Sequence, residues 1–258
     1  MKTSLSPLLN PDEPLSYDAL NPNSTVPLLF TAPHAGGQTP ENLGTLGWDK
    51  DAFREICHKY PYGDIGIADL SRELARLTGT YTLLSNYHRR ALDINRPRNE
   101  KAFKLRGGAP PMNINMSAEE QEIRFQAIFD PYHKALRQRL ETIPPEALID
   151  IHSFHSHIAG DEYDVGFFFT NEEGEKIARE FGKIFKNING AALRIGYNVP
   201  YDLTDPEVND GTILKTYEQA PGFGLEIRND HIDTKKKAVK FAALLHECLK
   251  VMYPKFII

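Results

Sequence analysis

Short apolar runs that alternate with amphipathic helical patterns are the feature that most constrains the fold of this 258-residue chain. Short runs bounded by turn-forming residues are typical of buried strands. We predict strands at residues 26–32, 80–85, 90–94, 147–151, 164–169 and 223–227. Strands and helices in alternation indicate the α/β class, here a mixed, largely parallel central sheet flanked by helices.

The segments between these runs have helical periodicity. Residues 67–79 place Leu70, Leu74 and Leu77 on one face and end at Gly79, a residue suited to a helix C-terminus. Three further helices are predicted, at residues 117–140, 172–190 and 234–252. The first of these opens with the spacing of a capping box, Ser117 and Glu120, and Pro131 should kink or divide it.

The chain carries no obvious domain boundary, internal repeat or low-complexity tract. We therefore expect one domain over residues 1–258. Two stretches, residues 98–116 and 196–222, are rich in turn-forming residues and are predicted to be long surface loops. Long loops in compact domains often carry function.

Composition narrows the functional classes. The net charge is −5 and no basic stripe is present, which argues against nucleic-acid binding. Without an apolar run of membrane-spanning length or a signal-peptide pattern, we expect a cytoplasmic protein with no membrane partner. Cys57 and Cys248 are interpreted as reduced thiols. A thiol enzyme that uses Cys57 with His58 is the weaker alternative, because adjacent side chains rarely converge on one target.

Polar residues follow or interrupt four of the predicted strands. His34 follows the run at 26–32, the pair Asn95-Arg96 follows 90–94, and His152 follows 147–151. Glu226 lies within the last strand. Because ligands of open α/β sheets bind at the carboxyl ends of the strands, these positions together predict a site.

Two of these residues are candidate metal ligands. Asp150 precedes His152 by two positions, so both side chains should share one face of a strand, where the carboxylate can orient the imidazole. His34, His152 and one carboxylate would match a common catalytic zinc set. The third ligand is left open among Asp64, Asp69 and Glu41, and Asp64 is also a candidate helix N-cap.

Two further histidines follow the same strand. His155 and His157 have the opposite parity to His152 if the strand continues. They would then face away from His152. If the chain turns after Ser153, either of them can line the site or lie in solvent.

Glu226 lies in an apolar segment, where a carboxylate is costly unless it is paired or used. It can act as a general base toward water, or it can pair with Arg228, which strand alternation places on the same face. Arg96, with Arg89 or Arg90 upstream, can clamp a substrate carboxylate. The alternative for these arginines is a solvated basic edge.

Five segments of the chain resemble the N-formylglutamate amidohydrolase family. They are residues 31–40, with Pro-His-Ala-Gly; 62–79; 85–97, with Asp-Ile-Asn-Arg; 148–154, with Asp-Ile-His-Ser; and 224–230. They follow the family order and span most of the chain. The resemblance implies a zinc-dependent amide hydrolase, with one α/β domain similar in fold to the zinc carboxypeptidases.

The resemblance also implies roles for individual residues. His34, Asp64 and His152 would be the metal ligands, and Glu226 the catalytic carboxylate. Asn95 and Arg96 resemble the pair with which carboxypeptidase-like enzymes hold a substrate carboxylate.

Two positions depart from the related patterns. Gly37 stands where the carboxypeptidase motif His-x-x-Glu has its glutamate, and His88 stands where many relatives have a Ser-Arg pair. The resulting hypothesis is an amide hydrolase that binds one Zn²⁺ per chain and removes an acyl group from a small carboxylate-bearing substrate. Mn²⁺, Co²⁺ or Fe²⁺ would suit similar ligands. The alternatives are a metallo-carboxypeptidase or peptide amidase of the same fold, and a non-catalytic metal- or anion-binding protein.

Overall fold

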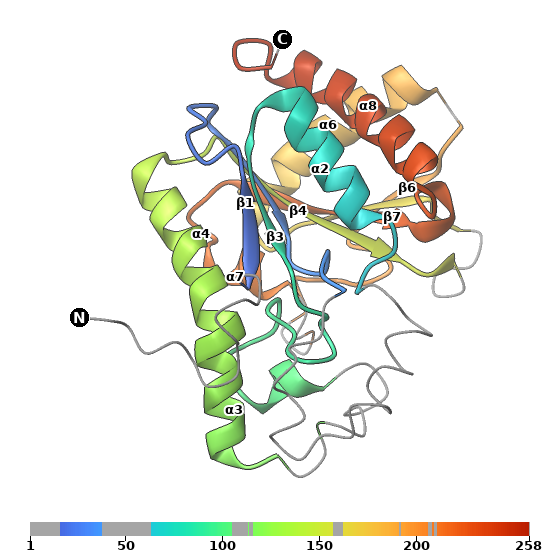
Figure 1. Ribbon diagram of the computed structural model, residues 1–258. Coiled ribbons are helices and arrows are strands. Elements are labelled where there is room, and N and C mark those ends of the chain that lie inside the picture. The colour runs from blue at the N-terminus through green and yellow to red at the C-terminus, as the bar shows by residue number, and fades with distance from the viewer. Residues whose placement is uncertain are drawn as a thin grey trace.

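A seven-stranded mixed sheet forms the centre of the computed structural model (Figure 1). The structure describes residues 16–37, 63–104, 113, 116–156, 162–190, 192–205, 208 and 211–257. The strands are β1 (Tyr17–Leu20), β2 (Leu28–Ala32), β3 (Tyr81–Ser85), β4 (Ala147–Phe154), β5 (Val165–Phe168), β6 (Ile195–Tyr197) and β7 (Gly222–Arg228). Their order in the sheet is β1-β3-β2-β4-β7-β5-β6. β1 and β5 run antiparallel to their neighbours β3 and β7, and the other pairs are parallel, as predicted.

In the described part of the chain, the helices begin and end close to the predicted positions, except α7, which lies in a stretch predicted to be a loop. They are α2 (Ile67–Thr78), α3 (Ala118–Arg124), α4 (Asp130–Thr142), α6 (Glu172–Asn189), α7 (Thr212–Thr216) and α8 (Lys235–Met252). Ser117 and Glu120 form the predicted capping box, and Gly79 ends α2 in the left-handed conformation. The break predicted near Pro131 takes the form of a π-helical segment, η4 (Phe125–Phe129), between α3 and α4. Proline cannot donate the regular helical hydrogen bond, which favours such an irregularity.

Alternate residues of each strand face two different layers. On one face of the sheet, Ile149 and Ile151 of β4 join a core with residues of α2, α6 and α8. On the other face, Leu148 packs with residues of η4 and α4. Figure 1 shows α2, α6 and α8 together on one side of the sheet, and α4 and α7 on the other. Asp150 and His152 alternate with Ile149 and Ile151 along β4, so their side chains leave the sheet on the side of α4 and α7.

One predicted strand is wrong. Residues 90–94 form turns: the Ala91 N–H donates to the His88 carbonyl at 2.8 Å, and the Asp93 N–H donates to Ala102 at 2.8 Å. The segment is apolar because it is a buried loop, and burial alone does not distinguish a buried loop from a strand. The edge strands β1 and β6 were not predicted, since each has only 3 to 4 residues and is half-buried.

The two stretches predicted as long loops are only partly described. Residues 98–116 include a short 3₁₀ helix, η2 (Glu100–Phe103), and the rest of that stretch is largely outside the described residues. Residues 196–222 contain α7 together with turns.

The remaining structural expectations concern cysteines and the membrane. Cys248 is buried in α8, and burial raises the pKa of its thiol to about 12, which fits a packing role. Cys57 and His58 lie outside the described residues. None of the helices in the described ranges has the length and apolar character that a membrane crossing needs.

Candidate metal centre

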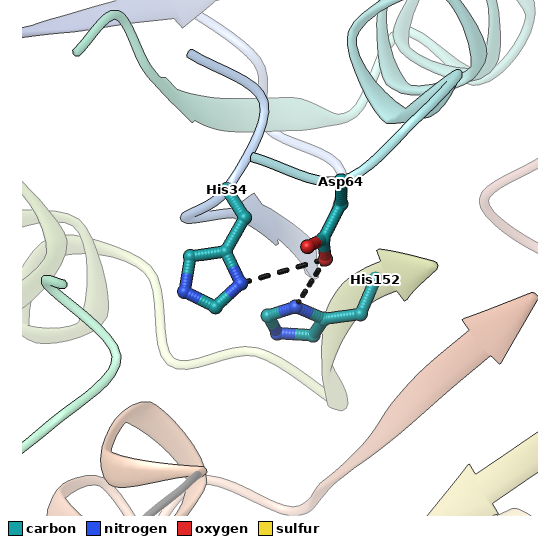
Figure 2. Close-up of side chains that lie close together, drawn as sticks. All are labelled: His34, Asp64 and His152. Atoms are coloured by element: carbon teal, nitrogen blue, oxygen red, sulfur yellow. Dashed lines mark hydrogen bonds and ion pairs between the residues drawn. The ribbon is translucent and has the colours of Figure 1, made fainter. Parts of the chain in front are cut away.

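Three buried side chains converge at the carboxyl end of the central strands. His34 follows β2, Asp64 precedes α2, and His152 belongs to β4. One ligand atom from each lies within 4.8 Å of the others, so the group can hold a metal ion. Figure 2 shows the Asp64 carboxylate between the two imidazole rings. The structure thus brings together the residues predicted as ligands.

The tautomer of His34 follows from its two partners. Its Nε2 lies 2.7 Å from Asp93 Oδ1, and its Nδ1 lies 3.0 Å from Arg89 Nη1. A guanidinium nitrogen can only donate, so Nδ1 accepts and Nε2 carries the proton that it donates to Asp93. Asp64 Oδ2 lies 3.4 Å from Nδ1, and a metal ion bound there would take the lone pair that now accepts from Arg89. This is the arrangement that a metal-ligating histidine needs.

His152 is held in the same way by a different aspartate. Its Nε2 lies 2.9 Å from Asp150 Oδ2, and its Nδ1 lies 3.0 Å from Asp64 Oδ2. Burial opposes protonation, but the two flanking carboxylates together raise the pKa of His152 well above its ordinary value. A metal ion bound at Nδ1 would replace that proton, so metal binding here is coupled to proton release.

Asp64 is not the N-cap of α2. The N-cap position belongs to Gly66, and no side chain bonds there. The Asp64 carboxylate instead accepts a hydrogen bond from the Ser153 N–H at 3.2 Å and faces both histidines. Burial would raise the pKa of Asp64, yet His34 and His152 hold it well below its ordinary value. A carboxylate that stays ionised beside two imidazoles fits the predicted third ligand.

Two glycines allow Asp64 to reach this position. Gly66 has a φ of 81°, and a Cβ there would overlap the carbonyl oxygen of Ile232. A Cβ on Gly63 would lie 2.6 Å from the His34 carbonyl oxygen, which accepts the Asp64 N–H at 3.0 Å. The sequence Gly-Asp-Ile-Gly therefore brings the Asp64 backbone against the loop that carries His34.

Asp93 is a site residue that the sequence analysis did not single out. It is fully buried, and beyond His34 it pairs with Arg89 at 2.5 Å and with Arg96 at 3.4 Å. Burial raises its pKa, but Arg89, His34 and Arg96 outweigh burial and hold the pKa far below its ordinary value. The available signal was an aspartate in an apolar run, two residues before Asn95, in the segment misassigned as a strand.

The residues predicted to bind substrate occupy different depths. Arg89 lies nearest the ligands, with Nη1 3.4 Å from Asp64 Oδ1. Asn95 is 4% exposed and directs its amide nitrogen to Asp150 at 3.2 Å. Arg96 is 8% exposed beside Asp93. Arg90 is half-buried, and its main-chain N–H donates to His88 Nδ1 at 3.0 Å, which gives His88 a place in this turn.

Glu226 lies next to His152 across the sheet. The two residues are register partners in the parallel pair β4–β7, so their side chains leave the same face. Glu226 is 8% exposed. Arg228, on that face two residues later, pairs with Asp164 at 2.9 Å and with Asp230 at 2.8 Å. Glu226 therefore neighbours His152 in the sheet, and its role as a general base stays a prediction.

The remaining candidates are only partly described. β4 continues to Phe154, so His155 lies just beyond its end, where its Nδ1 is 3.0 Å from Asn229 Nδ2. His157 and Glu41 lie outside the described residues.

Comparison with known proteins identifies the class. The family model described as N-formylglutamate amidohydrolase matches residues 26–232, and the chain belongs to this family. The match covers the loop of His34, the strand of His152 and most of the sheet.

Two curated relatives are both called N-formylglutamate deformylase. The protein from Pseudomonas putida is 29% identical over 150 residues, which are 52% of this chain and 54% of that protein. The protein from Pseudomonas aeruginosa is 29% identical over 165 residues, 57% of this chain and 58% of that protein. The matched regions thus span little more than half the length of these curated relatives.

Two solved structures share the fold. The gene product Atu2144 from Agrobacterium tumefaciens superposes with a TM-score of 0.76 at 21% identity, over 95% of this chain and 99% of that one. The N-formylglutamate amidohydrolase from Ralstonia eutropha JMP134 gives a TM-score of 0.61 at 15% identity, over 94% and 98% of the two chains. The predicted α/β class is confirmed, and the likeness to zinc carboxypeptidases stays a prediction.

Proposed function

We propose that this protein is a zinc-dependent amide hydrolase that removes the acyl group from a small N-acyl amino acid similar to N-formylglutamate. The observation that carries the proposal is the buried group His34, Asp64 and His152, in which each imidazole is oriented by a second aspartate. Membership of the amidohydrolase family and the names of the curated relatives support the reaction class. We propose further that residues 1–258 act as one domain.

The donor set suits zinc. Two imidazole nitrogens and one carboxylate are the ligand types of catalytic zinc sites, which keep a further position open. Bound at these three residues, Zn²⁺ would supply Lewis acidity toward the scissile carbonyl and toward water.

The chain's own residues would move the proton. Glu226, beside His152 in the sheet, accepts a proton from the attacking water and passes it to the nitrogen of the leaving amine. The C–N bond then breaks, and the products are a carboxylic acid and an amino acid. One carboxylate serves as base and then as acid, so no second titrating group is required.

Arginines would bind the substrate carboxylate. Arg96, with Arg89 or Arg90, provides guanidinium donors. Arg89 and Arg96 flank Asp93, the residue that accepts a hydrogen bond from His34. Guanidinium groups suit planar, bidentate recognition of carboxylates. Substrate length would distinguish the two kinds of enzyme, since a peptide hydrolase should accept long substrates and an acyl-amino-acid hydrolase should not.

The test is metal content and turnover of the purified protein. We expect about one zinc per chain in the wild type, loss of zinc in His152→Ala, and hydrolysis of N-formyl amino acids that chelators abolish. His246→Ala, on α8 at the opposite face of the sheet, is the matched control and should keep its zinc. Wild-type protein that takes up no zinc, or activity that survives full chelation, would refute the proposal.

A further inference from the structure

We propose that Asn95 is a positioning residue that holds both histidine–aspartate pairs of the metal centre and links them to α7. This inference rests on the proposed function, because it concerns how the zinc ligands are held. It assigns Asn95 a role other than the substrate contact that the family resemblance implies.

The main chain of Asn95 reaches the first pair. Its N–H donates to Asp93 Oδ1 at 3.0 Å. The same oxygen accepts the proton of His34 Nε2 at 2.7 Å. One carboxylate oxygen is thereby fixed between a backbone donor and the imidazole, which sets the direction of His34.

The side chain of Asn95 reaches the second pair. Its Nδ2 donates to Asp150 Oδ2 at 3.2 Å, the oxygen that also accepts from His152 Nε2 at 2.9 Å. Nδ2 lies 3.1 Å from that imidazole nitrogen, as expected of two donors that share one acceptor. Thr31 donates to the other oxygen of Asp150 at 2.6 Å, so three donors hold this carboxylate.

Contacts with α7 settle which way the amide points. The Ile213 N–H lies 3.0 Å from the Asn95 side-chain oxygen, and the Thr212 N–H lies 3.1 Å from its main-chain carbonyl. A backbone N–H can only donate, so the side-chain atom facing Ile213 must be Oδ1. Nδ2 is therefore the atom directed at Asp150.

The polar atoms of Asn95 are used within the protein. The whole residue is 4% exposed, and its Oδ1 and an Nδ2 proton are used within the protein. Arg96 is buried as well, at 8% exposed, and its guanidinium pairs with Asp93 at 3.4 Å. We thus assign Asn95 to the zinc ligands and leave the guanidinium of Arg96 as the proposed partner of the substrate carboxylate.

The experiment measures zinc affinity of the wild type, Asn95→Ala and Asn95→Asp by competition with a chelator. Loss of such a supporting contact to a metal-bound histidine should weaken zinc binding about 10-fold or more. Asn95→Asp keeps an acceptor for Ile213 and replaces the donor to Asp150 with a carboxylate oxygen, so it tests the same contact if Asn95→Ala does not fold. Asn171→Ala removes the N-cap amide of α6 and should leave zinc affinity within about twofold, since such caps affect stability.

Turnover gives a second reading. If Asn95 positions His152, the variant loses kcat by the same factor on substrates with a free carboxylate and on their methyl esters. A folded variant with wild-type zinc affinity and a KM raised only for free carboxylates would overturn the inference and restore Asn95 to substrate binding. If the wild type binds no zinc, the proposed function fails and the inference fails with it. If only the variant result disagrees, the inference alone fails.

Discussion

The two faces of the central sheet differ in what they bury, although the same strands build both. Along β4, Ile149 and Ile151 enter the apolar layer of α2, α6 and α8, while Asp150 and His152 leave the opposite face toward the metal centre. All four residues are buried. The face of Asp150 and His152 also carries Leu148, which joins the second apolar core near the start of the strand. We call the part of this face that carries Asp150 and His152 the polar face, and the face of Ile149 and Ile151 the apolar face.

This difference shows how stability and chemistry are separated within one sheet. The apolar face needs residues of suitable size and shape, and each Å² that it removes from water contributes about 25 cal/mol. The polar face buries charges that are costly unless every one has a partner. Asp93 and Asp150 provide those partners for the two histidines, so the polar face is specified contact by contact.

The largest expected effect is on the polar face. Glu226→Gln removes the proposed base while it preserves the shape of the side chain, and we expect turnover to fall by about 10²- to 10⁴-fold. Zinc content should stay at the wild-type value, since Glu226 is not one of the three ligand residues. Steady-state kinetics and elemental analysis test this, with exposed Glu247→Gln as the control. Wild-type turnover in the variant would remove Glu226 from the mechanism.

The next effect belongs to the apolar face. Phe167 of β5 is fully buried against the rings of Phe181 and Phe223, so Phe167→Ala should lower the free energy of unfolding by about 3–5 kcal/mol. Zinc affinity of the folded variant should change less than twofold, because the cavity opens on the side away from the ligands. Denaturant unfolding and chelator competition measure both quantities. Ile188→Ala, 40% exposed on α6, should change stability by about 0.5 kcal/mol or less.

A third prediction concerns Asp93, the aspartate that orients His34. Asp93→Asn keeps an acceptor for His34 but removes the negative charge that orients it, so zinc affinity should fall about 10- to 100-fold. Asp233→Asn, at the start of α8, is the matched charge change and should not affect the metal. A variant that loses stability but keeps wild-type zinc affinity would show that Asp93 serves the fold and not the site.

Much of the architecture was predictable because it depends on local pattern. The helix that begins after Ser117 and the one that ends at Gly79 have side-chain or glycine signals that act within a few residues. The same-face relation of Asp150 and His152 follows from strand alternation, and the structure confirms it.

The misassigned segment marks the limit of such patterns. Residues 91–94 are buried like a strand, but their backbone turns and brings Asp93 against His34, Arg89 and Arg96. Contacts between residues distant in sequence decide this, and one sequence does not display them. For the same reason, the sequence did not indicate that Asp93 supports His34, although it indicated Asn95 and Arg96 as a motif.

The last prediction concerns the pH dependence of stability that His133, a buried histidine of α4, should cause. His133 of α4 stacks between Phe129 and Tyr217, and its Nε2 donates to the Ile94 carbonyl at 2.8 Å. Burial lowers the pKa of this histidine to about 4, below the value near 6.5 expected in the unfolded chain. The folded protein therefore keeps His133 neutral, whereas the unfolded chain takes up a proton as pH falls through 6.5.

The contribution of His133 to stability is thus fully present above pH 6.5 and is lost progressively down to about pH 4. Between pH 6.5 and 5, the free energy of unfolding should fall by roughly 2 kcal/mol from this group. Denaturant unfolding of wild type and His133→Gln at both pH values measures the difference, and the variant should show a flatter pH dependence. Asp64 and Asp93, with lowered pKa values, lose their contribution only below about pH 4, outside this interval. If the free energy of unfolding of the two proteins depends equally on pH, His133 has the same pKa in the folded and unfolded states. Burial would then not lower its pKa, and the prediction would be wrong.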